Sequence, residues 1–214
     1  TPKYTARTGK LWLEQGGAFA LANIRGGGEF GPKWHQAALK DKRQNAFDDF
    51  AAVAQDLIAR NITSPRHLGI MGGSNGGLLM GASFTRHPGL FNAVVCQVPL
   101  LDMLRYHKLL AGASWMGEYG DPDDPGSRPA ITAYSPYQNL VKDKTYPKVL
   151  FVTSTKDDRV HPGHARKMAA KMLEMGHPFY YFENIEGGHG ADANLKQKAR
   201  RAALEYVYLL RQLR

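Results

Sequence analysis

One serine, Ser74, stands in a context that can make its hydroxyl a nucleophile. Residues 72–77 read Gly-Gly-Ser-Asn-Gly-Gly, with a short β-like run before them and a small-residue helical stretch after them. This Gly-x-Ser-x-Gly pattern is typical of a sharp strand-to-helix turn that presents the serine to a carbonyl group. We expect no room for a side chain at Gly72 and Gly76, and we expect the Asn75 N–H to stabilise a developing oxyanion. An ordinary glycine-rich turn is the alternative.

A serine hydroxyl needs a base to remove its proton, and the sequence supplies a candidate base and a candidate acid. Asp157 follows the apolar run at residues 149–154, and His189 follows the run at residues 179–184. The order Ser…Asp…His is the one that accompanies such a turn. We therefore predict a catalytic triad of Ser74, Asp157 and His189 for acyl transfer, in which the acid orients the imidazole. Taken singly, the acid could belong to a solvated turn and the histidine to a polar loop.

The elements that must position these residues alternate along the chain. β-rich runs occupy residues 19–24, 67–71, 93–97, 149–154 and 179–184. Helical patterns occupy residues 8–15, 47–60, 77–86, 164–175 and 194–213. Such alternation predicts an α/β fold with a mostly parallel sheet and helices on both faces. The proline-rich stretch from residue 99 to 147 is too long for a simple loop, so we expect short helices and loops over the carboxyl edge of the sheet.

Two of the predicted helices carry further signals. Asn45 is a plausible N-cap of the helix at residues 47–60, and Asn61 can end that helix in a left-handed conformation. The C-terminal helix interleaves apolar with basic residues, which predicts a solvated basic face made by Lys196, Lys198, Arg200, Arg201, Arg211 and Arg214. The net charge is +9, but no nucleic-acid-binding motif accompanies it, so we expect no nucleic-acid partner.

The composition is that of an ordinary globular chain. Of the 214 residues, 43% are hydrophobic and 22% are charged. No stretch approaches the roughly 20 apolar residues of a membrane span, so we expect no membrane partner. Cys96 is the only cysteine, which excludes an internal disulfide and a cysteine-based zinc site. We expect a cytoplasmic protein. The periplasm is the alternative, since any export signal would lie upstream of residue 1.

Two further patterns suggest cofactors, and we favour neither. Residues 26–31 match Gly-x-Gly-x-x-Gly, but Pro32 follows them, and the acids about twenty residues further on lie in a predicted helix, which does not suit a dinucleotide. His161 and His164 have a spacing that could bind zinc, yet Pro162 between them indicates the start of a helix. We therefore expect no metal and no other cofactor.

Several segments together resemble the prolyl oligopeptidase family of serine peptidases. They are residues 21–31, 34–35, 47–50, 72–77, 157–160 and 188–190, so the resemblance runs through nearly the whole chain. It implies an α/β-hydrolase fold and one catalytic domain over residues 1–214, without the β-propeller that covers this domain in the family. It also implies that the substrates are short peptides cleaved after proline through an acyl-enzyme.

The same resemblance implies roles for individual residues. Ser74, Asp157 and His189 match the triad, and Asn75 matches a residue of the oxyanion hole. The substrate-binding residues that it implies are Arg159 for the peptide backbone and, for the proline pocket, Trp115, Tyr119, Val160 and Leu100. A proline ring is flat and apolar, so an indole wall would favour it without a charged partner.

Alternatives remain for specificity and for activity. If Trp115 only packed in the core and Glu118 faced the pocket, basic residues would be preferred over proline. The resemblance also places a strand beside the elbow strand, and a tyrosine oxyanion donor, upstream of residue 1. A chain without them would be a weakly active or inactive fragment that associates with a partner chain through an unpaired sheet edge. An acylaminoacyl-peptidase or an esterase on the same scaffold is a further alternative.

Overall fold

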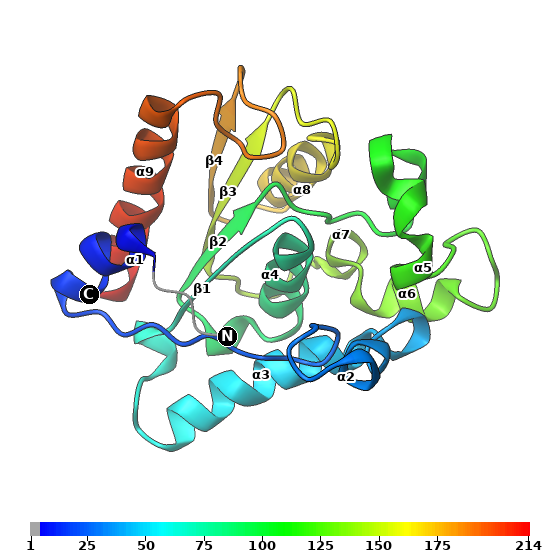
Figure 1. Cartoon of the computed structure of the whole chain (residues 1–214), viewed down its shortest axis with the longest axis horizontal. Helices are drawn as coiled ribbons and strands as arrows, with labels where there is room; N and C mark the ends of the chain where they lie inside the picture. Colours follow the sequence, from blue (N-terminus) through cyan, green and yellow to red (C-terminus); the bar gives the residue numbers. More distant parts are fainter. Residues whose placement is uncertain (1–4) are drawn as a thin grey trace.

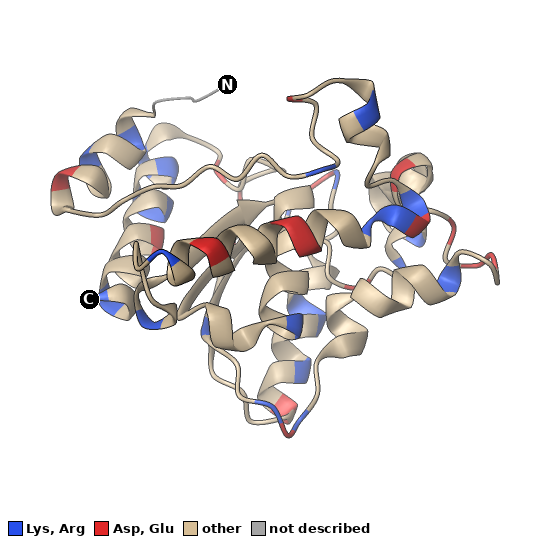
Figure 2. Cartoon of the chain, turned by 90° about the horizontal axis from the view of Figure 1, so that it is seen from below, with Lys and Arg blue, Asp and Glu red and all other residues tan. Residues whose placement is uncertain are grey.

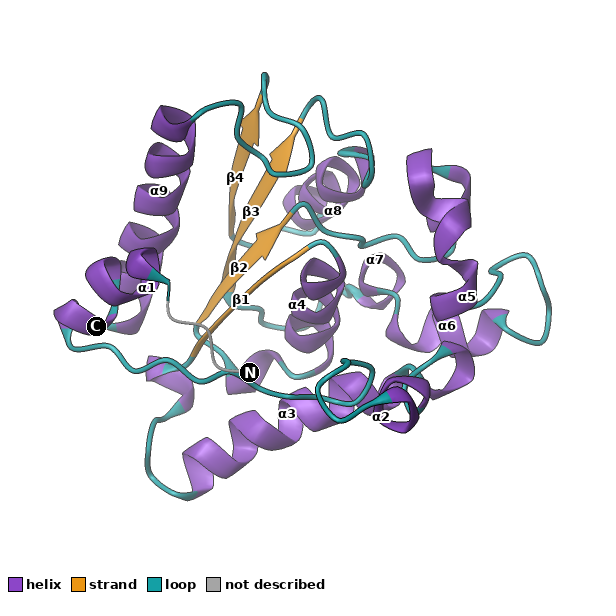
Figure 3. Cartoon of the chain, viewed as in Figure 1, coloured by secondary structure: helices purple, strands orange, loops and turns teal. Residues whose placement is uncertain are grey.

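The computed structural model describes residues 5–214, and these contain one parallel sheet (Figures 1 and 3). Its strands are β1 (Gly69–Gly73), β2 (Ala93–Gln97), β3 (Lys148–Ser154) and β4 (Phe179–Asn184), in that spatial order. All three neighbouring pairs are parallel. The predicted α/β fold with a parallel sheet is therefore confirmed. The first four residues of the expected domain lie outside the described range.

Helices cover both faces of this sheet (Figure 1). One face packs against α9 (Leu195–Leu213), which has α1 (Ala6–Leu11) beside it. The other packs against α4 (Asn75–Arg86) and α8 (Gly163–Glu174), with α3 (Gln44–Ala59) against α4. Successive strand residues therefore enter opposite cores, since side chains alternate along a strand. In β2 the side chains of Val94 and Cys96 enter the core on the α4 side, and those of Ala93 and Val95 the core on the α9 side.

The remaining helices are short. The α-helices among them are α2 (Pro32–Gln36), α5 (Met116–Tyr119), α6 (Arg128–Tyr134) and α7 (Pro136–Asn139). The 3₁₀ turns cover Leu13–Gln15, Lys40–Lys42, Pro65–His67, Pro88–Leu90, Tyr106–Lys108 and Leu110–Trp115. Five of these ten elements lie between β2 and β3, so the long proline-rich stretch consists of short helices and loops, as predicted.

The strand predicted at residues 19–24 is not formed. This segment runs as a loop in which Phe19 is 60% and Leu21 57% exposed. A β-strand needs a neighbour to complete its backbone hydrogen bonds, and none of the described strands pairs with this segment. β1 is consequently an edge strand that pairs with β2 alone among the described strands.

Local signals at the helix ends are followed only in part. The predicted N-cap at Asn45 is wrong, because α3 already begins at Gln44 and the Asn45 side chain donates to the Ala37 carbonyl instead. Asn61 does have the predicted left-handed conformation after α3, with a φ of 56°.

The basic face predicted for the C-terminal helix is interrupted. Arg201 is only 8% exposed, whereas the other five basic residues predicted for this face are exposed. Burial of Arg201 follows from its ion pairs with Asp192 and Glu205. In Figure 2 the Lys and Arg positions are scattered over several elements. Within residues 5–214, no helix combines the length and the apolarity that crossing a bilayer requires.

Candidate active site

Ser74 stands at the turn between β1 and α4. Its backbone has a φ of 59° and a ψ of −117°, a strained conformation that costs about 1–3 kcal/mol for a residue with a side chain. Its N–H donates to the Gln97 carbonyl at 2.9 Å, which ties the turn to the end of β2. The turn therefore has the strained strand-to-helix geometry that the glycine pattern predicts.

The glycines around Ser74 differ in the room they have. A Cβ built on Gly72 would lie 2.6 Å from the Gly76 carbonyl oxygen, so any side chain there would push the turn apart. A Cβ built on Gly76 would meet no atom within 4 Å. The expected crowding is confirmed at Gly72 and is wrong at Gly76, because Gly76 borders a cavity instead of packed atoms.

The structure brings the three residues of the predicted triad together. The Ser74 hydroxyl lies 3.1 Å from Nε2 of His189. Nδ1 of the same imidazole lies 2.9 and 3.0 Å from the two carboxylate oxygens of Asp157. A carboxylate only accepts hydrogen bonds, so Nδ1 carries the hydrogen and Nε2 is free to accept from the serine. This geometry suits attack by a hydroxyl with assistance from a base.

The Asp157 carboxylate is held by its own loop. Its side chain is completely buried, and Oδ1 accepts the backbone N–H groups of Arg159 and Val160, both at 2.9 Å. Asp158, the second acid of the pair, is exposed. A solvated acid pair therefore does not describe Asp157.

Asn75 lies where an oxyanion donor is expected. It is the first residue of α4, so its N–H has no acceptor within the helix. The N-terminal end of a helix also carries partial positive charge. A negative oxygen formed beside Ser74 would be stabilised by both.

The Asn75 side chain belongs to a hydrogen-bonded cluster that the sequence did not reveal. Its Oδ1 accepts from the Arg43 guanidinium and from the Tyr119 hydroxyl, the latter at 2.9 Å. Arg43 also pairs with Glu118 at 2.6 Å, and its guanidinium lies 4.9 Å from the centroid of the Tyr119 ring. Arg43 and Asn75 are 32 residues apart, so no local pattern connects them.

The four residues expected to form a proline pocket lie in one apolar cluster. Leu100, Tyr119 and Val160 are buried in it, and Trp115 packs against it while staying partly exposed. Leu78 of α4 is in the same cluster, which places the cluster against the helix that begins after Ser74. Trp115 is therefore the member of the four with the most surface to offer a ligand.

Arg159 lies at the same edge of the sheet, and its side chain is exposed. Its carbonyl accepts from the Ala111 N–H at 3.3 Å, which joins the loop after β3 to the 3₁₀ turn that ends at Trp115. Arg159, predicted to bind the peptide backbone, and Trp115, predicted to form the indole wall, therefore lie on two segments that are in direct contact.

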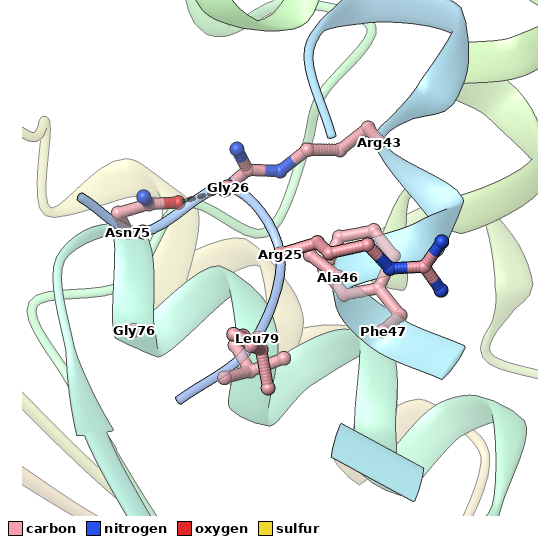
Figure 4. A pocket seen from close by; sticks show the side chains of 10 residues that line it. Arg25, Gly26, Arg43, Ala46, Phe47, Asn75, Gly76 and Leu79 are labelled. Carbon is pink, nitrogen blue, oxygen red and sulfur yellow. Dashed lines mark hydrogen bonds between the residues drawn. The ribbon is translucent and has the colours of Figure 1, made fainter. Parts of the chain in front are cut away.

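A cavity of about 210 Å³ adjoins the start of α4 (Figure 4). Its lining includes Arg25, Arg43, Phe47, Asn75 and Gly76, and Figure 4 shows Arg43 reaching to the Asn75 side chain. None of the four residues of the expected proline pocket lines it. Phe47 and Leu79 belong both to the lining and to the apolar cluster that contains Trp115, so the cavity adjoins that cluster on the side of α3 and α4.

The two patterns that suggested cofactors lie in other contexts. The glycine-rich turn at residues 26–31 follows a loop and leads into the five-residue α2, not from a strand into a long helix. His164 is buried, and its Nδ1 accepts the backbone N–H groups of Leu101 and Asp102. Burial lowers the pKa of His164 to about 4, so it remains a neutral acceptor.

One group of described residues has its possible metal-ligand atoms within 4.8 Å of one another, namely His107, Asp121 and Asp123. Lys108 pairs with Asp123 at 2.8 Å. Hydrogen bonds from Lys108 and His107 lower the pKa of the Asp123 carboxyl. The charge of this carboxylate is thus already balanced by a neighbouring ammonium group.

Comparisons with known proteins agree on one family. A family model described as the prolyl oligopeptidase family matches residues 4–214. An uncharacterized peptidase of Sinorhizobium fredii, y4nA, is 64% identical over 212 residues, which are 99% of this chain and 29% of that protein.

Solved structures are similar as well. A post-proline cleaving enzyme from Rickettsia typhi is 44% identical with a TM-score of 0.93, over 100% of this chain and 31% of that one. Prolyl oligopeptidase B of Galerina marginata, bound to a 25mer macrocyclization substrate, is 35% identical with a TM-score of 0.84, over 89% of this chain and 27% of that one. The expected α/β-hydrolase fold is confirmed by this likeness. The chain spans less than a third of the length of the proteins it matches.

Proposed function

The chain belongs to the prolyl oligopeptidase family, and from this we propose that it is a serine peptidase that hydrolyses short peptides after proline. The observation that carries the proposal is the pair of hydrogen bonds that links Ser74 to His189 and His189 to Asp157. The Ser74 hydroxyl oxygen lies 3.1 Å from Nε2 of His189, and Nδ1 lies 2.9 Å from Oδ2 of Asp157. These residues lie 115 and 32 positions apart in the chain, so their meeting is a product of the fold.

The proposed reaction proceeds through an acyl-enzyme. The Ser74 oxygen attacks the carbonyl carbon of the scissile peptide bond while Nε2 of His189 takes the hydroxyl proton. The imidazolium then gives this proton to the leaving amine nitrogen as the C–N bond breaks. A water molecule, deprotonated by the same imidazole, then attacks the carbonyl carbon of the Ser74 ester. The bond from this carbon to the Ser74 oxygen breaks as the imidazolium returns the proton to that oxygen, which releases the new carboxyl group and restores the serine. Asp157 holds the ring and stabilises its positive charge throughout.

Asn75 has a proposed role in both steps. The carbonyl oxygen becomes an oxyanion in each tetrahedral intermediate, and the Asn75 N–H is the donor nearest to the nucleophile along the chain. Loss of one such donor typically costs about 2.7–4 kcal/mol of activation free energy, or about a hundred- to a thousandfold in rate.

The preference for proline rests on Trp115 and on the state of Glu118. The indole offers an apolar surface beside a buried cluster, which suits a flat ring. The Glu118 carboxylate accepts from Arg43 at 2.6 Å and from the Asn75 side chain at 3.2 Å. A carboxylate paired in this way offers little charge to a basic side chain, so we propose proline over lysine at this position.

A two-part experiment tests the proposal. The 214-residue chain is treated with a fluorophosphonate, which reacts with activated serines, alongside its Ser74→Ala variant. It is then assayed on a proline-anilide and on a lysine-anilide. We expect labelling that vanishes in the variant and faster release from the proline substrate. Absence of labelling would contradict the proposal and favour an inactive chain, and faster lysine release would overturn the assigned pocket.

A further inference from the structure

A buried ion-pair cluster lies beneath the loop that carries His189. Arg201 of α9 donates through Nε and Nη2 to both oxygens of Asp192, at 2.6 to 3.0 Å. Its Nη1 donates to Glu205 at 2.9 Å. Asp192 belongs to the His189 loop, whereas both of the other residues are on α9. One guanidinium therefore fixes this loop to a helix of the scaffold.

The same cluster reaches the turn that carries Ser74. The Glu205 carboxylate accepts from the side-chain amide of Gln97, the last residue of β2. The backbone carbonyl of Gln97 in turn accepts the Ser74 N–H at 2.9 Å. Hydrogen bonds therefore run without a break from the backbone of the proposed nucleophile to the loop of the proposed base.

The side chains of the cluster are almost completely shielded from solvent. Glu205 is 1% exposed, and the side chains of Arg201 and Asp192 are 10% and 7% exposed. Two carboxylates share one guanidinium, whose planar fork fixes the direction of each bond. Buried pairs of this kind often add little net stability over apolar residues, and their best-attested use is to specify one geometry.

The residue types of this loop permit many backbone conformations, so its hydrogen bonds to the scaffold decide which one it adopts. It contains Gly187, Gly188 and Gly190 around His189, and glycine permits many backbone conformations. Ala191 has a positive φ of 63°, and its carbonyl accepts from the Asn184 side chain at 2.8 Å. That bond fixes the loop to the end of β4, and the Ser154 hydroxyl of β3 donates to the Gly187 carbonyl. On the other side, Gln197 and Arg201 both bind the loop to α9, and only Arg201 does so through a buried ion pair.

We propose that Arg201 is a positioning residue for the reaction proposed above. Through Asp192 it sets where the His189 imidazole lies. Through Glu205 and Gln97 it keeps the imidazole at a fixed position relative to Ser74. Arg201 contacts neither the Ser74 hydroxyl nor the imidazole in the described structure, and it lies outside the apolar cluster that contains Trp115. The inference rests on the proposed function, because it assigns Arg201 to that same site.

The test compares Arg201→Ala with the exposed neighbour Arg200→Ala in the full 214-residue chain. A misplacement of reacting groups by about 1 Å costs about a hundredfold in rate, so we expect Arg201→Ala to slow fluorophosphonate labelling and kcat to that degree. We expect KM for the proline-anilide to stay within about twofold. Added guanidinium chloride, below denaturing concentrations, should restore part of the rate by filling the vacated site, and sodium chloride at equal ionic strength should not. Asp192→Asn, which keeps the side-chain volume, should show a smaller loss in kcat.

Hydrogen exchange of the peptide that covers residues 185–194 is measured on the same variants. We expect faster exchange there in Arg201→Ala and unchanged exchange in β2 and β3. Labelling, kcat and exchange all equal to those of Arg200→Ala would overturn the inference. If the wild-type chain is not labelled at all, the proposed function fails, and unchanged loop exchange would then separately overturn the role of Arg201 in holding the loop.

Discussion

Nδ1 of His189 lies 2.9 Å from Oδ2 of Asp157, and the Asp157 side chain is completely buried. Because the carboxylate also accepts two backbone N–H groups of its own loop, neither its position nor its acceptor role depends on the histidine. The imidazole is consequently oriented by a group that is itself fixed, with Nε2 toward Ser74.

Asp157→Asn should therefore abolish most of the activity without unfolding the chain. With its oxygen at the Oδ1 position the amide keeps both backbone hydrogen bonds, but its NH2 group then faces Nδ1 and favours the wrong imidazole tautomer. In a serine protease this change lowers kcat by about four orders of magnitude. Steady-state hydrolysis of a proline-anilide measures the effect. Asp158→Asn changes the exposed neighbour and is the matched control, which should stay within about twofold of wild type. Equal losses in both variants would contradict the assignment of the acid.

Gly72→Ala should disrupt the turn at Ser74, whereas Gly76→Ala should be tolerated. The added methyl group at Gly72 would lie 2.6 Å from a backbone oxygen, so the turn must move, but the same group at Gly76 meets open space. We expect a loss of about 1–3 kcal/mol in the free energy of unfolding for Gly72→Ala, as in other overpacked sites, together with lost labelling. Urea denaturation and fluorophosphonate labelling measure the two effects. Equal behaviour of the two variants would refute the crowding argument.

Trp115→Ala should reduce the selectivity for proline more than the activity itself. Removal of the indole takes away apolar contact with the substrate ring, and contact with a single methylene group is already worth about 1–3 kcal/mol, or about 10- to 200-fold in kcat/KM. The ratio of kcat/KM for proline- and alanine-anilides is the quantity to compare. Phe30→Ala removes an exposed aromatic side chain elsewhere and should leave the ratio unchanged. A ratio unaffected by Trp115→Ala would mean that the indole only packs.

The Arg43–Glu118 pair should control both stability and charge preference. Arg43→Met leaves the Glu118 carboxylate without its guanidinium partner. We therefore expect kcat/KM for the lysine-anilide to rise relative to kcat/KM for the proline-anilide. Glu118→Ala leaves a guanidinium that is only 6% exposed without its carboxylate, and we expect a cost of about 2 kcal/mol, below that of fully buried pairs because Glu118 is partly exposed. Urea denaturation measures this cost. Glu14→Ala breaks the exposed pair with Lys10 and should cost less than about 1 kcal/mol.

Stability should fall as the pH drops from about 6.5 to about 4, and His164 should cause part of the fall. Burial lowers the pKa of His164 from its ordinary value of 6.5 to about 4, so in this window the unfolded chain binds a proton that the folded chain does not. The contribution of His164 is fully present above pH 6.5, and up to about 3 kcal/mol is lost by pH 4. Urea denaturation at pH 7, 5.5 and 4.5 measures it. His164→Gln should show a flatter pH dependence, and an equal slope would contradict the assignment.

The sequence was sufficient for the elements whose signals are local. The elbow around Ser74, the buried strands and the ends of α8 and α9 follow from glycine placement and hydrophobic runs, so these elements lie within one or two residues of their predicted positions. The order of acid and base after two successive strands was enough to place Asp157 and His189 at one edge of the sheet.

What the sequence could not show depends on distant partners. A run such as residues 19–24 has strand composition but forms a strand only beside another strand. Arg43, just before α3, and Arg201, within α9, are buried because carboxylates far along the chain or one helical turn away neutralise them. The local sequence around either arginine gives no sign of this. Asn45 satisfies the composition of an N-cap, but its side chain finds a different carbonyl.

The distance along the chain between Ser74 and His189 has a consequence for folding. A contact across 115 residues is strongly non-local, so we expect it to form late in folding, when the loop after β4 packs against the sheet. In a chain whose C-terminal segment is not yet folded, the Ser74 hydroxyl therefore lacks the His189 imidazole as its hydrogen-bond partner. The onset of rapid fluorophosphonate labelling during refolding would accordingly report when the loop that carries His189 packs beside Ser74, and not when the sheet forms.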